Sequence, residues 1–303
     1  GAAVTLNKLM DTTDANGEVT TSVSSRSTPL SFRIRATLDG KGVSTLSDSI
    51  VVSTGTPVQK AFSLSISDSN VEGLDVDANG SAASASVTVA MGDKFGNPVA
   101  DGTPVAFQTN VGVVGSASKG GCNSINGACT VDFRAQQPRV PTPNTPATIC
   151  NGPLGSSDST RAGVGTICAS TSDGSAIPIF AKVNFFISGS RPATIILDGN
   201  KTLTMGNDVN DLGNVSWNVP KVFTLQINDV NNNPMPSGTT VEVANIVRAA
   251  SGGVSPSSVQ KTFPSVSSLP PQYQGTSHLV TIASPAGLPC TPGVATFNVN
   301  ITT

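Results

Sequence analysis

Apolar and polar residues alternate with a period of two along much of the chain. Clear examples are Ala61–Ile66, Ser84–Val89, Lys182–Ile187 and Val222–Ile227. Because successive side chains of a strand point to opposite faces, this pattern predicts β-strands with one buried face. Clusters of Gly, Pro, Asn and Asp separate the alternating segments, and no segment of about ten or more residues has the 3.6-residue period of an amphipathic helix. The pattern therefore predicts an all-β protein of antiparallel sheets.

An internal repeat divides the chain. Asp93–Val105 aligns without a gap on Asp229–Val241, an offset of 136 residues. Both copies follow an alternating strand, contain Asn-Pro after a polar turn, and carry Gly-Thr before the next strand. Gly96 and Asn232 suit a turn position with positive φ, so these residues are folding devices rather than chemical ones.

A second match marks the ends of the repeats. Ser49–Thr54 falls on Asn184–Gly189 at an offset of 135, and Thr296–Ile301 has a similar pattern at the end of the chain. A β-sandwich of roughly 100 residues fits the 303-residue chain about three times. We expect units at residues 1–55, 56–190 and 191–303, the second with an insertion at about 138–165.

The first unit is predicted to be incomplete. Residues 1–55 contain the later strands of a repeat but no counterpart of the turn that begins at Asp93. Either the molecule is a fragment of a longer chain, or the missing strands come from a neighbouring subunit by strand addition. An open half-sandwich with unpaired edges would otherwise be prone to aggregate.

The Asp93–Val105 segment resembles a known repeat. With the Asn126-Gly127 turn that follows, it is similar to the group 1 bacterial immunoglobulin-like repeat of the invasin and intimin type, D-x-x-G-N-P-V-x-[DG]-G-T-x-V-x-F, whose later turn D-x-x-G-x-[AV] matches Asp14–Val19. The likeness covers most of residues 10–190 and is weaker over 191–303, where Ser237 stands for an acidic residue. It implies tandem immunoglobulin-like β-sandwiches that form a rod or stalk on the bacterial cell surface.

Composition excludes several functions. Charged residues are 12% of the chain, against roughly 25% in an average soluble protein, and the net charge is −2. No cluster of Lys and Arg offers a nucleic-acid site, and no apolar stretch is long enough for a membrane span. With one histidine, His278, and no Gly-x-Ser-x-Gly motif, we expect no enzyme activity.

Five cysteines point to disulfides. None lies in a CxxC pair or near the histidine, which argues against zinc. Cys122 and Cys129 flank a turn-rich loop, and Cys150 and Cys168 bracket the insertion, so we expect these two pairs. Cys290 would then be either a buried free thiol or a partner in an intermolecular bond. Disulfides place the chain outside the cytoplasm.

The segment Asp75–Gly80 begins like a calcium loop, D-x-D-x-N-G. Asp75, Asp77 and Asn79 could contribute oxygen ligands, but Ser86 occupies the twelfth position, where such a loop needs a bidentate glutamate. A polar turn is therefore the preferred interpretation, and we expect no cofactor.

The sequence favours a structural or adhesive extracellular protein. Its expected partners are neighbouring immunoglobulin-like domains or subunits of the same protein, and a fibre completed by strand exchange is one possible assembly. The alternative is a glycan- or matrix-binding module, which would contact a host or surface glycan or protein through loops of the second unit, Gly112–Gly121 and the insertion.

Overall fold

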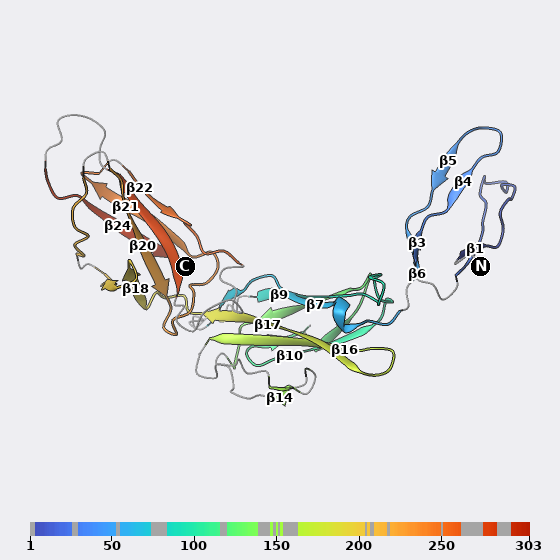
Figure 1. Cartoon of the computed structure of the whole chain (residues 1–303), viewed down its shortest axis with the longest axis horizontal. Helices are drawn as coiled ribbons and strands as arrows, with labels where there is room; N and C mark the ends of the chain where they lie inside the picture. Colours follow the sequence, from blue (N-terminus) through green and yellow to red (C-terminus); the bar gives the residue numbers. More distant parts are fainter. Residues whose placement is uncertain are drawn as a thin grey trace.

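The structure is a computed structural model of the chain, and it contains sheets with a single short 3-10 helix, η1(Gln59–Ala61), in the residues that it describes. It describes all residues except 1–3, 26–29, 53–54, 74–83, 116–119, 139–145, 148–149, 151, 154–162, 204, 207–208, 217–218, 250, 262–274 and 284–291. The predicted all-β class is confirmed. Three groups of strands follow one another along the longest axis of the molecule (Figure 1). We call them unit 1 (residues 4–52), unit 2 (55–190) and unit 3 (191–303).

Unit 2 is a β-sandwich of two sheets. Its strands are β7(Phe62–Ile66), β8(Asn70–Glu72), β9(Ser84–Met91), β10(Pro104–Thr109), β11(Val113–Val114), β12(Gly121–Asn123), β13(Ala128–Arg134), β16(Val164–Ser172) and β17(Pro178–Ser188). One sheet has the order β11-β13-β9-β7 and the other β12-β10-β16-β17-β8. All pairs are antiparallel except β8 with β17. The short strands β14(Pro146–Ala147) and β15(Gly152–Pro153) pair within the insertion.

The inner faces of the two sheets form the core of unit 2. Along β13, Cys129, Val131 and Phe133 are buried and alternate with exposed residues, as the period of two predicts. The rings of Phe133 and Phe185, which come from opposite sheets, meet edge to face with centroids 4.6 Å apart, and both side chains are fully buried. Truncating either ring would cost about 3–5 kcal/mol.

Unit 3 is a second sandwich with a smaller second sheet. Its strands are β18(Thr194–Leu197), β19(Lys201–Leu203), β20(Lys221–Asn228), β21(Thr240–Val247), β22(Ser251–Ser255), β23(Thr276–Ala283) and β24(Thr296–Thr302). The larger sheet has the order β19-β18-β20-β23-β22, and β21 pairs with β24. Phe223 and Phe297 stack between the sheets with ring centroids 6.0 Å apart.

The last strand of unit 3 has a different place in its sandwich from the one that the sequence alignment predicts. The alignment places Thr296–Ile301 at the position of the strand around Asn184, which lies in β17. In the structure, β24 pairs with β21 as β16 pairs with β10, and β10 and β21 follow the two repeated turns. Its counterpart is therefore β16. Neighbouring strands of one sheet share the same alternation, so the pattern alone could not separate the two positions.

Unit 1 consists of three two-stranded ladders. They pair β1(Val4–Leu6) with β2(Val23–Ser25), β3(Leu30–Phe32) with β6(Ile50–Val52), and β4(Arg35–Thr37) with β5(Ser44–Leu46). None of the described residues of unit 1 is buried, and the side chains of Leu9 and Met10 are 83% and 80% exposed. Unlike units 2 and 3, this segment has no packed interior in its described part.

Candidate functional site

Units 2 and 3 meet at a junction that several hydrogen bonds cross. The amide of Ser69 donates to the carbonyl of Lys261 at 2.6 Å, and the amide of Ser237 donates to the carbonyl of Asn70 at 2.9 Å. The side-chain amide of Asn70 donates to the carbonyl of Gln260 at 3.2 Å. Main-chain groups on both sides therefore connect the end of one sandwich to the beginning of the next.

The connecting segment is fixed at the same place. The amide of Gly189 donates to Oδ2 of Asp229 at 2.8 Å, and this bond is buried. The hydroxyl of Ser190 donates to Oε1 of Glu72 at 2.6 Å, and the hydroxyl of Thr303 donates to the carbonyl of Ser190 at 2.6 Å. A linker held by both units cannot act as a free hinge.

The outer face of the sheet in unit 2 is buried where it meets this junction. Val71 and Ile187 belong to the core, so their neighbours Asn70 and Ser188 lie on the opposite face. Both are 0% exposed. Asp68 accepts from the amide of Asn70 through Oδ1 and from the hydroxyl of Ser237 through Oδ2. The carboxylate of Asp68 therefore fixes the main chain at Asn70 and also binds Ser237 of unit 3.

Four separate turns of the chain have the same structure, and each begins with an aspartate: Asp14, Asp93, Asp173 or Asp229. The Oδ1 of each accepts the amide hydrogens of the residues two and four positions later, at 2.8–3.0 Å. The residue three positions later has a φ between 59° and 83°. The sequence motifs predict the turns at Asp14, Asp93 and Asp229. They do not predict the turn at Asp173, because Ala176 stands where a Gly or Asn is expected.

Cys122 and Cys129 form a disulfide between the two sheets of unit 2. Their Cα atoms are 6.0 Å apart. Cys122 lies on β12 and Cys129 on β13, and the Ile125–Ala128 bridge closes the turn between these strands. The bond therefore joins two strands that share no ladder, which adds a covalent connection between the layers.

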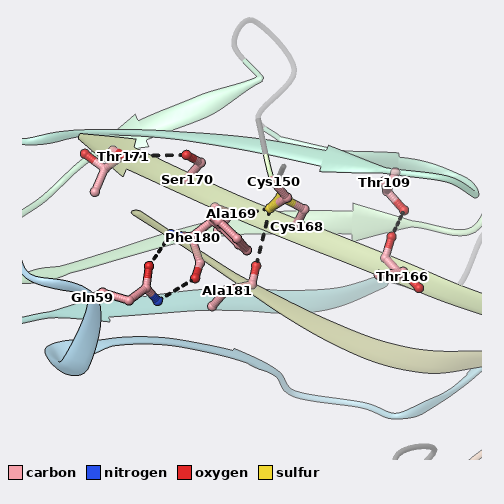
Figure 2. The surroundings of a disulfide bond; sticks show 10 residues. All are labelled: Gln59, Thr109, Cys150, Thr166, Cys168, Ala169, Ser170, Thr171, Phe180 and Ala181. Carbon is pink, nitrogen blue, oxygen red and sulfur yellow. Dashed lines mark hydrogen bonds between the residues drawn. A yellow bond between two sulfur atoms is a disulfide. The ribbon is translucent and has the colours of Figure 1, made fainter. Parts of the chain in front are cut away.

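Cys150 and Cys168 form the second disulfide, which attaches the insertion to the outer face of a sheet (Figure 2). Their Cα atoms are 6.2 Å apart and both residues are fully buried, with Phe180 of β17 packed against them. The first eight residues of β16 are all buried, so neither face of this strand is open to solvent. The side-chain amide of Gln59 also bonds both main-chain polar groups of Phe180, at 2.8 and 3.0 Å.

The remaining predicted positions lie outside the described residues. These are Cys290 and the three residues of the calcium-like segment, Asp75, Asp77 and Asn79. Elsewhere in the described part of the chain, no group of three or more His, Cys, Asp or Glu side chains is arranged to hold a metal ion. No helix in the described ranges is long and apolar enough to cross a membrane.

His278 is buried inside unit 3, where it is 1% exposed. Its Nδ1 lies 2.7 Å from the carbonyl of Pro256, and its Nε2 lies 3.1 Å from the hydroxyl of Thr276. Because a carbonyl can only accept, Nδ1 carries a proton. Burial lowers the pKa of His278 below its ordinary value of 6.5, and the bond to Pro256 opposes this shift. The ring is therefore a neutral packing group.

No protein-family model matches the chain, and no curated protein matches it. Among solved structures, the adhesin InvE of Yersinia pseudotuberculosis aligns with a TM-score of 0.27 and 12% identity, over 82% of this chain and 60% of that one. The Escherichia coli adhesin FdeC aligns with a TM-score of 0.30 and 12% identity, over 94% of this chain and 78% of that one. The chain thus spans about three fifths of the InvE structure, and we base its proposed function on its own contacts.

Proposed function

We propose that the chain is a spacer: a stack of immunoglobulin-like sandwiches, outside the cytoplasm on a bacterial surface, that holds an adhesive or structural element at a distance. The observation that carries this proposal is the junction, where Asn70 alone makes two hydrogen bonds to unit 3 and is fully buried. A spacer must resist bending between its modules, and direct bonds across module ends supply that resistance. The resemblance of the repeats to surface proteins and the two disulfides support the location.

The stiffness of the junction can be measured in the full chain. Spin labels at the exposed positions Thr130 of unit 2 and Ser277 of unit 3 should give a single narrow distance distribution by electron–electron double resonance. Asn70→Ala should broaden that distribution, whereas Ser63→Ala, at an exposed position of β7, should leave it unchanged. A broad distribution in the unsubstituted chain would refute a rigid spacer.

We further propose that unit 1 is completed by strands other than its own, supplied by a neighbouring subunit of a fibre. No described residue of unit 1 is buried, and apolar side chains such as Leu9 and Leu46 are more than half exposed. Covering such a surface with added strands removes it from water. The full chain should then associate with increasing concentration in analytical ultracentrifugation, and Leu46→Lys should reduce the association. A chain that stays monomeric at all concentrations would contradict the fibre and leave the stiffness of the spacer unaffected.

A further inference from the structure

Strand β12 lies at one edge of its sheet. In the part of unit 2 that the structure describes, it pairs only with β10. The carbonyl of Gly120, just before β12, accepts the amide hydrogen of Phe107 at 3.1 Å. Because only every second residue of an antiparallel strand bonds to a given neighbour, the main-chain groups of Gly121 and Asn123 point away from β10. This edge therefore presents donors and acceptors in the spacing of a β-ladder.

The edge of β12 is fixed in place and is not blocked. Cys122, between Gly121 and Asn123, is bonded to Cys129 of the other sheet and packs against the core. Natural edge strands are commonly protected by Pro, Lys or a bulge, and β12 has none of these. Asn123 is exposed. A partner strand would thus meet a preformed edge, so that little binding free energy is spent on ordering it.

The outer face of the sheet is hollowed beside this edge. The register places Gly121, Ala106 and Ser170 in one row across β12, β10 and β16. These small residues line a hollow of about 490 Å³, which also borders on Pro104 and Pro178. None of the described residues that line the hollow is charged. The hollow is therefore suited to an uncharged group, because an ion would find no partner there.

The position of the hollow next to the edge indicates the kind of partner. Directly opposite residues of paired strands are neighbours on the same face of the sheet. On a strand added to β12, the residue opposite Gly121 would project its side chain over Gly121 toward Ala106. A neutral sugar could enter the hollow, but it could not continue the ladder at the edge. An extended peptide uses both features.

We propose that β12 binds an extended segment of a partner protein, which adds to the sheet as a further strand and places an aliphatic side chain in the hollow. Hydrogen bonds to the main chain of Gly121 and Asn123 supply affinity, and the hollow selects the side chain. This role goes beyond the spacer function, because it makes the side of unit 2 a binding surface.

Phage-displayed random peptides, selected on the full chain, test the proposal. The selected peptides should carry an aliphatic residue between polar ones, and the synthetic peptides should shift the NMR signals of the Gly121 and Asn123 amides. Methylating the main-chain nitrogen of the aliphatic residue removes one ladder hydrogen bond, so binding should weaken about fivefold. A selection that yields no such peptide, or peptides that leave both amide signals unchanged, would overturn the proposal.

A matched pair of variants tests the hollow. Ala106→Leu fills it and should weaken peptide binding about tenfold. Ala90→Leu makes the same change at an exposed position of β9, on the outer face of the other sheet, and should leave binding unchanged. Equal binding by the two variants would overturn the proposal, as would a neutral oligosaccharide that displaces the peptides from the hollow.

A second pair tests the edge. Asn123→Pro removes an amide that points away from β10, a position where an edge strand tolerates proline, and should weaken binding about fivefold. Asn123→Ala keeps that amide and should bind as the original chain does. Circular dichroism should show the same sheet content in both variants. If the proline variant kept this sheet content and bound the peptides as tightly as the alanine variant, strand addition at β12 would be wrong.

Discussion

Gly189 donates its amide hydrogen to Oδ2 of Asp229 across 2.8 Å, so the linker that leaves unit 2 is bound to the turn that follows β20 in unit 3. The same carboxylate accepts the amides of Asn231 and Asn233 through Oδ1, both at 2.8 Å. One side chain therefore shapes the turn and joins the two sandwiches. Asp173 shapes a turn of the same kind between β16 and β17, away from the linker.

The pair Asp229 and Asp173 separates these two roles. Asp229→Ala should destabilise unit 3 by about 2–3 kcal/mol, because buried amides lose a charged acceptor, and it should also broaden the distance between units 2 and 3. Asp173→Ala should destabilise unit 2 and leave the distance unchanged. Calorimetry gives the stabilities and the spin labels give the distance. An unchanged distance in Asp229→Ala would show that the linker bond does not stiffen the junction.

Positive φ at the fourth position of the turn leads to a second prediction. Ala176 adopts a φ of 61°, where a side chain costs about 1–2 kcal/mol relative to Gly. Ala176→Gly should therefore raise the free energy of unfolding of unit 2 by about 0.5–1 kcal/mol, after the greater entropy of the unfolded glycine is included. Gly96→Ala is the reverse test, because a Cβ there meets no atom within 4 Å and only the φ of 83° opposes it. Urea unfolding should show opposite signs for the two variants.

Local features of the sequence predicted the strands and most of the turns, because both depend on neighbouring residues. The alternation at Lys182–Ile187 lies within β17, and the repeated turn at Asp229 has the expected positive φ at Asn232. The junction could not be predicted in this way. Asn70 and Gln260 are 190 residues apart, and neither has a local pattern that marks it as a contact residue.

The disulfides should limit the length to which unit 2 extends when it is unfolded by force. Cys122–Cys129 and Cys150–Cys168 enclose 7 and 18 residue steps, which oxidised unit 2 cannot extend. Reduction should lengthen the unfolding step of unit 2 by about 75 Å in single-molecule pulling, at up to 3.6 Å per residue. Cys150→Ser with Cys168→Ser should account for most of that gain, and the same change at Cys122 and Cys129 for the rest. Equal steps before and after reduction would show that these cysteine pairs are not bonded in the protein.

The disulfides should also contribute unequally to stability. In the chain-entropy account, a bond stabilises by limiting the unfolded chain, and the contribution grows with the length of the loop it closes. Removing the Cys150–Cys168 bond should therefore lower the free energy of unfolding of unit 2 by about 3 kcal/mol, and removing Cys122–Cys129 by about 2 kcal/mol. Urea unfolding of the two double-serine variants measures this order. A larger loss at Cys122–Cys129 would point to its connection between the sheets as the dominant effect.

Burial of His278 makes the stability of unit 3 depend on pH. Its pKa is lowered in the folded state, so the ring stays neutral there while the unfolded chain takes up a proton below about pH 6.5. Protonation then favours unfolding, and stability should fall as the pH decreases from 7.5 to 5.5 and remain level above 7.5. His278→Gln cannot take up this proton and should unfold at the same temperature at both pH values. If the substituted protein lost as much stability on acidification as the original, the pH dependence would have to arise from carboxylates instead.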